Sequence, residues 1–198
     1  YYSGSDQLAQ FKQRRNGLGA DVGYQFNART ELRAGEDYQW FGERRIVGNP
    51  VGQEFNLTPL VTSVRFQYLG QDEVMLPTKG SEVRSSFSFY TQRPNSNDGL
   101  SQLDITTEHF IPSGKRGIIF GTASGGTSFG ASNLGLAGFS LGGPLRLTAY
   151  SRGELLGDDY FLGQAGYLFR LSHLNPIFGD AIYVGGFYEL GKIFGGNA

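Results

Sequence analysis

Hydrophobic and polar residues alternate along most of this chain with a period of two, which is the period of a β-strand with one apolar and one polar face. Between residues 18 and 26, one face carries Leu18, Ala20, Val22, Tyr24 and Phe26. The alternation recurs near residues 32–40, 64–68, 83–89, 103–111, 118–120, 161–171 and 182–190. The pattern therefore predicts an all-β fold of about eight strands.

Most of the connections between these segments are short and rich in turn-forming residues. Asn, Pro, Ser and Gly gather at residues 27–29, 77–80, 93–99 and 112–115. Turns this short join antiparallel neighbours, so the strands are expected to form a meander. The connection from about residue 125 to residue 159 is the exception. It is glycine-rich and far longer than the usual connection of about 4–6 residues, so we expect it to have a function.

Length and composition agree with a single β-structured segment covering residues 1–198. The chain has 31 glycines, and aromatic residues make up 14% of it. Its net charge of -1 disfavours nucleic acid as a partner, and it has no cysteine for disulfides or thiolate metal sites. It has no apolar run of about 18 residues, which excludes a spanning helix, whereas a membrane β-strand needs only about 10 alternating residues.

Two classes of β protein fit the alternation, because either the apolar or the polar face can point inward. A soluble sandwich or barrel buries its apolar face, and a membrane barrel turns that face to lipid. Aromatic residues near the strand ends favour the membrane class, as in interfacial aromatic girdles. They are Tyr24, Phe26, Tyr38, Trp40, Phe66, Tyr68, Phe87 and Phe89. The alternative is a soluble β domain that binds a ligand through the long loop.

A third and weaker hypothesis is a serine hydrolase. Gly138-Phe-Ser-Leu-Gly142 matches the G-x-S-x-G nucleophile elbow around Ser140. The elbow requires a helix after the serine, and Gly143-Pro144 followed by a strand-like segment disfavours one. The available partners would be His173 with Asp158, Asp159 or Asp180. His109 and His173 lack carboxylates at metal-binding spacing, so no metal and no cofactor is expected.

Charged residues at the far end of the long loop suggest how the loop is held. Arg146 and Arg152 lie there, and Glu189 lies on the polar face of the last strand. A loop folded into the lumen of a barrel would bring an arginine close to that carboxylate. We therefore predict a contact of Arg146 or Arg152 with Glu189.

Three passages, in this order along the chain, resemble the barrel of the bacterial surface-antigen superfamily. That superfamily includes outer-membrane protein assembly factors and two-partner secretion transporters. Residues 64–68 with Leu76-Pro-Thr-Lys-Gly80 are similar to its strand and F-P-T-R-G turn. Residues 139–150, leading into residues 153–157, resemble its lumen-inserted loop, and Tyr188-Glu-Leu-Gly191 resembles the acidic strand motif that holds the loop. The sequence of residues 139–150 is most similar to that of superfamily members that carry an upstream patatin-like phospholipase domain.

The resemblance implies a segment of a larger transmembrane barrel, cropped at both ends, in the outer membrane of a Gram-negative bacterium. Its implied role is to anchor a passenger, such as a fused phospholipase domain, or to assist its export or insertion. The barrel segment itself is not expected to be an enzyme, and its partners would be outer-membrane lipid and the passenger. The implied loop residues are Gly138, Gly142, Gly143 and Tyr150. The family loop usually reads Arg-Gly-Phe or Arg-Gly-Tyr, and Thr148-Ala149 stands here instead, so the arginine role is expected to pass to Arg146 or to be lost.

Overall fold

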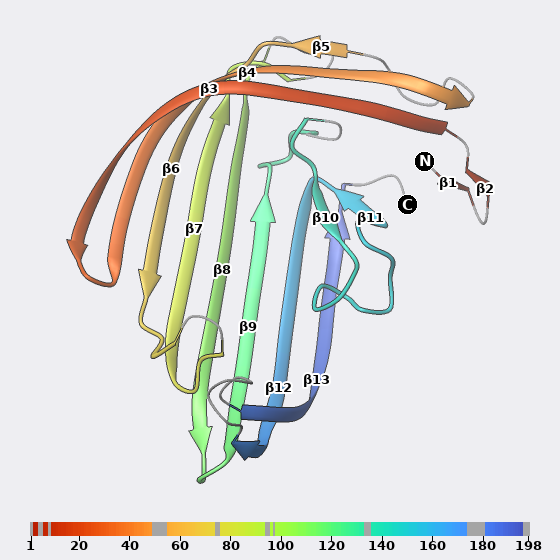
Figure 1. Cartoon of the computed structure of the whole chain (residues 1–198). Coiled ribbons are helices and arrows are strands. Elements are labelled where there is room, and N and C mark those ends of the chain that lie inside the picture. The colour runs from red at the N-terminus through yellow and green to blue at the C-terminus, as the bar shows by residue number, and fades with distance from the viewer. Residues whose placement is uncertain are drawn as a thin grey trace.

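The computed structural model describes residues 2–3, 6–7, 9–48, 55–73, 76–93, 96, 98–132, 136–173 and 181–195. Its main feature is one large antiparallel sheet, seen in Figure 1 as a curved wall. The strands along this sheet are β3 (Ala9–Asn27), β4 (Thr30–Gly48), β6 (Leu60–Leu69), β7 (Gly80–Tyr90), β8 (Leu100–Ser113), β9 (Gly117–Thr127), β12 (Asp159–His173) and β13 (Ala181–Phe194). Within the described residues, no helix is long and apolar enough to cross a membrane.

The strand order is β13-β12-β9-β8-β7-β6-β4-β3, so each strand pairs with its neighbours in sequence apart from the short elements between them. This order confirms the predicted meander of about eight strands. The short strand β5 (Phe55–Leu57) pairs with β4, and β1 (Tyr2–Ser3) pairs with β2 (Asp6–Gln7). Two further short strands, β10 (Phe139–Leu141) and β11 (Leu155–Gly157), pair with each other inside the long loop. The sheet is open, with β3 and β13 as its two edge strands.

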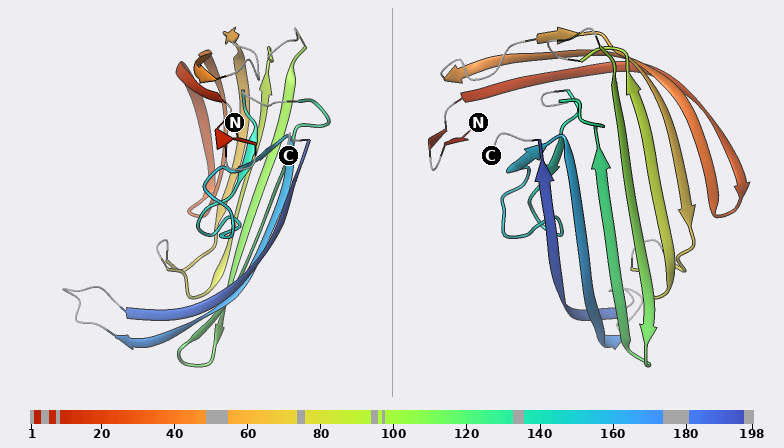
Figure 2. Two further views of the ribbon diagram at one scale, coloured as in Figure 1. Left: turned by 90° about the vertical axis from the view of Figure 1, so that its right-hand side faces the viewer. Right: turned by 180° about the vertical axis from the view of Figure 1, so that it is seen from behind.

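The two faces of the sheet differ sharply in polarity, as the alternation predicted. The outer face, defined here as the face that carries Tyr24 and Phe87, leaves large apolar side chains exposed: Tyr24 is 65% exposed and Phe87 is 39% exposed. The inner face, which carries Gln164 and Glu189, lies on the concave side, where Figures 1 and 2 place the long loop. The molecule therefore buries little of its apolar strand face within itself.

The buried apolar residues form two small clusters, and both lie where the long loop meets the sheet. The first contains Phe41, Val61, Tyr90, Leu100 and Leu136. The second contains Leu141, Tyr160 and Leu162, with Phe139, Leu147, Leu155 and Ile193 packed against it. Each cluster combines loop residues with residues of several strands, so the loop supplies much of the dry packing in the fold.

Candidate functional site

The candidate site is the contact between the inner face and the segment of residues 128–158, called here the inner loop. The inner loop leaves β9 after Thr127 and enters β12 at Asp159. Its ends are close together because β9 and β12 are paired, with Tyr160 opposite Gly126. Both views in Figure 2 show the loop, with β10 and β11, on the concave side of the sheet. The prediction that the loop folds onto the inside of the curved sheet is therefore confirmed.

Glu189 on β13 is the residue that the tip of the loop contacts. Its Oε2 accepts hydrogen bonds from the backbone N–H of Thr148 at 2.8 Å and from the Thr148 hydroxyl at 2.7 Å. Its Oε1 accepts a hydrogen bond from Nε2 of Gln164 at 2.6 Å. The carboxylate thus has three donors, one from the sheet and two from the loop. We call Thr148, Gln164 and Glu189 the latch.

Gln164 connects the latch to a third strand and to a second point on the loop. Its Nε2 also donates to the carbonyl of Leu145 at 2.6 Å, and its Oε1 accepts from the Thr122 hydroxyl at 2.8 Å. Thr122, Gln164 and Glu189 are direct cross-strand partners on β9, β12 and β13. Because Leu145 O and Glu189 are both acceptors, the amide nitrogen of Gln164 must face them, and every polar atom of this side chain is then used.

The loop presents Thr148 through an unusual backbone conformation. Leu145 and Leu147 have φ values of 59° and 67°, in the left-handed region that L-residues enter at a cost of about 1–2 kcal/mol each. The turn is closed by hydrogen bonds from Gly142 N to Arg146 O at 2.7 Å and from Gly143 N to Tyr150 O at 2.9 Å. Gly142 has a φ of 113°, and a Cβ there would lie 2.1 Å from Ser151 O. Strain of this kind persists only when the surroundings hold it, and the latch does so here.

Apolar packing fixes the base of the loop against the same strands. Leu141 is fully buried against Tyr160 and Leu162 of β12. Phe139 packs on the Tyr160 ring with 4.9 Å between the ring centroids. Gly126 on β9 makes room for both rings, because a Cβ there would lie 2.5 Å from the Phe139 ring. The buried Tyr160 ring is in turn oriented by its hydroxyl, which donates to Asp104 Oδ2 at 2.7 Å.

The arginines predicted to contact Glu189 have other positions. Arg146 donates to the carbonyl of Ser140 at 3.2 Å, and its guanidinium lies over the Tyr160 ring at 5.9 Å from the centroid. Arg152 is exposed. Among the ion pairs of the described residues, none joins either arginine to Glu189. The correction has a physical reason: the left-handed turn points the N–H and hydroxyl of Thr148 at the carboxylate, and Arg146 turns back to close the loop on itself.

The other residues proposed for the loop stabilise its internal structure. Gly142 and Gly143 are buried and form the turn described above. Gly138 is exposed. The backbone of Tyr150 bonds within the loop, to Leu147 O at 3.0 Å and to Gly143 N, and its side chain is 43% exposed. Gly142, Gly143 and the backbone of Tyr150 thus shape the segment that carries Thr148, and Thr148 makes the contact with Glu189.

The residues of the serine hydrolase hypothesis are not brought together in the described part of the chain. Ser140 is exposed in β10, which pairs with β11, and a turn through Gly142 follows it where an elbow requires a helix. His109 contacts the Ser81 hydroxyl at 2.6 Å. Asp158 is buried, and Asp159 Oδ1 accepts from the N–H of Ser128 at 3.0 Å. Asp180 and the side chain of His173 lie outside the described residues.

The first part of the loop makes a second contact with the sheet, several strands away from the latch. Leu136 is buried among Phe41, Val61, Tyr90 and Leu100 of β4, β6, β7 and β8. The carbonyls of Leu136 and Ala137 accept from Arg15 on β3 at 3.3 Å and from Gln102 on β8 at 2.7 Å. We call this contact the upper anchor. The sequence did not predict this contact, because residues 9–15 show no regular alternation of apolar and polar positions.

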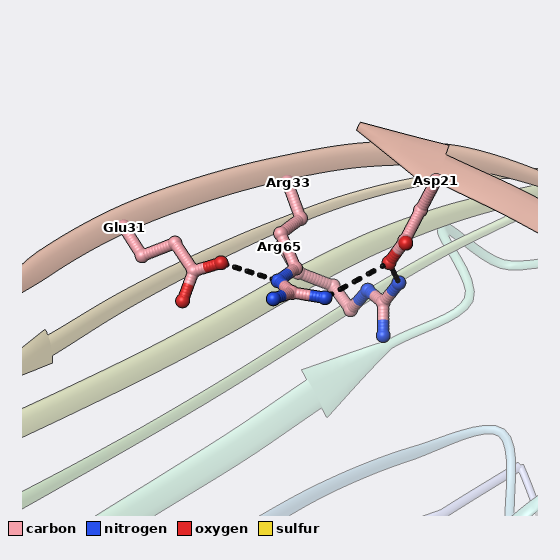
Figure 3. A network of polar contacts seen from close by, with 4 residues as sticks. All are labelled: Asp21, Glu31, Arg33 and Arg65. Atoms are coloured by element: carbon pink, nitrogen blue, oxygen red, sulfur yellow. Dashed lines mark hydrogen bonds and ion pairs between the residues drawn. The ribbon is translucent and has the colours of Figure 1, made fainter. Parts of the chain in front are cut away.

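A network of charged residues lies on the inner face away from the loop (Figure 3). Asp21 on β3 binds Arg33 at 3.4 Å and Arg65 at 2.6 Å, and Arg33 also pairs with Glu31. Arg33 and Arg65 are direct cross-strand partners, so the shared Asp21 carboxylate offsets their repulsion. The two arginine side chains are about half exposed, 47% and 50%, which is typical of charges on a wet surface.

Comparison with known proteins identifies the fold. No family model matches the chain, and no curated protein matches it. Among solved structures, the chain is similar to BamA from Haemophilus ducreyi lacking POTRA domains 1–3, with a TM-score of 0.75 and 14% sequence identity. The match covers 93% of this chain and 42% of that one, so the chain spans less than half the length of this structure. The chain has the fold of a BamA-like β-barrel segment with an open sheet.

Proposed function

We propose that this chain is part of the wall of a surface-antigen type β-barrel in the outer membrane of a Gram-negative bacterium. The observation that carries the proposal is the distribution of apolar side chains over a sheet with this fold. Large apolar residues are exposed along the outer face of every long strand, whereas ion pairs and the loop occupy the inner face. Lipid on one side and water on the other is the environment that satisfies both faces.

The soluble alternative requires the outer face to be covered by a dry core. Three residues distinguish the two hypotheses: Tyr24, Phe66 and Phe87 are 65%, 37% and 39% exposed. Exposed apolar patches of such extent mark contact with another apolar phase. The exposure of these three residues therefore favours a membrane barrel over a soluble β domain.

The proposed role of the barrel is to anchor a passenger, such as a fused patatin-like phospholipase domain, or to assist its export or insertion. The resemblance of residues 139–150 and 188–191 to the family's loop and strand motifs supports this role. In this scheme the inner loop occupies the lumen and is held there by the latch. The barrel wall contributes no catalytic group of its own.

Membrane fractionation tests the location. The chain is expressed with an export signal in a Gram-negative host, and its outer-membrane fraction is washed with alkaline carbonate. We expect the chain to stay in the pellet and to require detergent for extraction. A monomer that is soluble without detergent, with Tyr24, Phe66 and Phe87 protected from solvent, would refute the proposal.

The role in export has its own test. A folded reporter domain is fused upstream of the chain, and its accessibility to protease added outside intact cells is measured. Accessibility that depends on the chain supports export, and a reporter retained on the periplasmic side of the same membrane supports anchoring alone. A reporter released into the periplasm contradicts both roles.

A further inference from the structure

Residues 136–148 of the inner loop contact the sheet in two regions that lie toward opposite ends of the strand order. The upper anchor joins Leu136 and Ala137 to β3, β4, β6, β7 and β8. The second region is on β12 and β13, where the latch binds Leu145 and Thr148 and where Phe139 and Leu141 pack on Tyr160 and Leu162. One continuous segment thus reaches both edge strands, β3 through Arg15 and β13 through Glu189.

From this arrangement we infer that the inner loop is a strap that fixes the curvature of the sheet. The inference rests on the proposed function, because the curvature concerned is that of a barrel wall. A sheet of this size is held along its strands by hydrogen bonds but can still change its bend and twist between strands. A segment tied at two points across the concave face restricts that motion.

The chemistry of the two contacts suits a strap, because both are specific and they differ in kind. The upper anchor is mainly apolar, with Leu136 4% exposed and Leu100 0% exposed, and Gln102 adds a hydrogen bond to the loop backbone. The latch is polar, with Thr148 bound twice to one carboxylate. Neither contact replaces the other, since they hold different residues of the loop.

Two contacts in series have a property that two independent contacts lack. A strap released at one end no longer restricts the curvature of the sheet. Releasing its other end therefore has no further effect on the curvature. Independent local contacts more than about 7–10 Å apart contribute additively. Non-additivity of the two contacts, measured on the shape of the sheet, is therefore the signature of the strap.

The absence of cysteine allows spin labels to be placed at chosen sites only. Labels on Ala34→Cys in β4 and Val184→Cys in β13 report the distance between the two halves of the sheet. Both positions are exposed and belong to the outer face, opposite the face on which the loop lies. The distance distribution is measured by double electron–electron resonance, on the full chain in lipid vesicles, for each variant in this background.

One single variant, Leu136→Ala, releases the upper anchor. The other single variant releases the contact with β12 and β13 and carries Glu189→Gln together with Gly126→Val, because a Cβ at Gly126 would displace the Phe139 ring. The double variant combines the two releases. Leu156→Ala is the matched control, because Leu156 lies in the loop, is 47% exposed and belongs to neither contact. We expect a narrow distribution for the native chain and the control, and a loss of that narrow distribution in either single variant. The double variant should match the broader single variant. If Leu136→Ala fails to fold, Gln102→Ala takes its place in the single and the double variant, because it removes the hydrogen bond to the carbonyl of Ala137.

Two results would overturn the strap. Broadening that adds up in the double variant means independent contacts, and unchanged distances in all variants mean that the sheet holds its curvature alone. Both results leave the outer-membrane proposal intact if the chain enters the vesicles. A native chain that does not enter lipid at all refutes the proposed function, and the strap with it.

Discussion

Gln164 and Glu189 are opposite each other across β12 and β13, and Nε2 of Gln164 lies 2.6 Å from Oε1 of Glu189. The same amide nitrogen holds the carbonyl of Leu145 at 2.6 Å, and the other carboxylate oxygen holds Thr148. The tip of the loop is thus bound to the sheet by a carboxylate whose donors, in the part of the chain that the structure describes, are uncharged. Within the described residues, the side chains and backbone groups bound to Glu189 include no arginine, and Thr148 and Gln164 provide its closest donors.

Glu189→Gln should release the loop. The new amide has only one acceptor oxygen, so its NH₂ group must face either Gln164 or Thr148, which are both donors. Thr148 is exposed and Gln164 is half-buried, so the loss of one of these hydrogen bonds should weaken docking of the loop by about 0.5–1.5 kcal/mol. Trypsin cleavage after Arg146 or Arg152, measured by mass spectrometry in detergent micelles, should accelerate by up to about ten-fold, since 1.4 kcal/mol is a factor of ten.

Glu108→Gln is the matched control for this variant. Glu108 is also a glutamate on the inner face, but its recorded contact is a long bond of 3.4 Å from Gln71, which lies outside the loop. Cleavage at the loop arginines should keep its native rate in this variant. Equal acceleration in both variants would mean that general loss of negative charge opens the loop, and the latch would lose its support.

The Thr148 series separates the two bonds from the loop. Thr148→Val removes the hydroxyl donor and keeps both the backbone N–H and the side-chain shape, so docking of the loop should weaken by about 1 kcal/mol. Thr148→Ser should retain native protection against trypsin. Raising the ionic strength should change protection of the native chain little, because neither the hydroxyl nor the N–H is a charged partner for Glu189.

Thr148→Arg adds the complementary test, since it places an arginine where the resembling family has one. An Arg–Glu pair in a wet lumen is screened by salt, so protection should become dependent on ionic strength. Strong salt dependence in the native chain would show that a charged group, and not Thr148, holds the loop.

Gly126→Val should displace the base of the loop. Its Cβ would lie 2.5 Å from the Phe139 ring and 2.8 Å from the Tyr160 ring, and ring atoms of the cluster cannot both move away without loss of packing. Overpacking of this kind costs about 1–3 kcal/mol. The control is Gly121→Val on the same strand, where the nearest atom to a Cβ is Gln164 O at an ordinary 3.7 Å. Loss of loop protection should appear in the first variant alone.

The strands were predictable from sequence, and the contacts between loop and sheet were not. A strand with one apolar face repeats every two residues, which is why Tyr24 and Phe87 could be assigned to the same face. No periodic pattern in the sequence marks Thr148 as a contact residue, because its contact depends on the left-handed backbone at Leu145 and Leu147. Charge alone predicted an arginine as the donor to Glu189. The loop does contact Glu189, but the donor is Thr148.

The upper anchor was missed for a related reason. Residues 9–15 read Ala-Gln-Phe-Lys-Gln-Arg-Arg, and the polar residues fall on both faces, so no periodicity extends β3 to Ala9. Pairing with β4 supplies the strand structure there, and the contact of Arg15 with Leu136 spans 121 positions. No local pattern in the sequence indicates a contact between residues so far apart along the chain, and the contact becomes visible only in the folded sheet.

A lysine on the outer face should destabilise the fold more than a lysine on the inner face. Phe87 and Ser88 are neighbours on β7 and point to opposite faces. In lipid, Phe87→Lys should destabilise the fold by up to about 2–4 kcal/mol, depending on depth, whereas a lysine that replaces Ser88 faces water. Urea unfolding in vesicles measures both variants. Equal effects, or a larger loss for Ser88→Lys, would contradict a lipid-facing outer surface.

The turn between β6 and β7 should respond to acid through Asp72. Its carboxylate accepts hydrogen bonds from Thr78 Oγ1 at 2.6 Å, from Thr78 N at 2.9 Å and from Lys79 N at 3.1 Å. The bond from the Thr78 hydroxyl is the main cause that lowers the pKa of Asp72 from its ordinary 3.8 to about 2. Because the folded pKa is the lower one, the ionised carboxylate stabilises the turn fully above about pH 3.8.

That contribution is lost as the pH falls through about 2, when the carboxylate is protonated in the folded turn as well. Hydrogen exchange at the Thr78 and Lys79 amides, followed from neutral pH downward and corrected for the intrinsic rate, should show protection that falls across this window. Asp72→Asn removes the titrating group, so its protection should be lower at neutral pH and independent of pH. Protection in the native chain that stays constant through the window would show that the backbone bond from Asp72 N to Lys79 O, at 3.2 Å, holds the turn without the carboxylate.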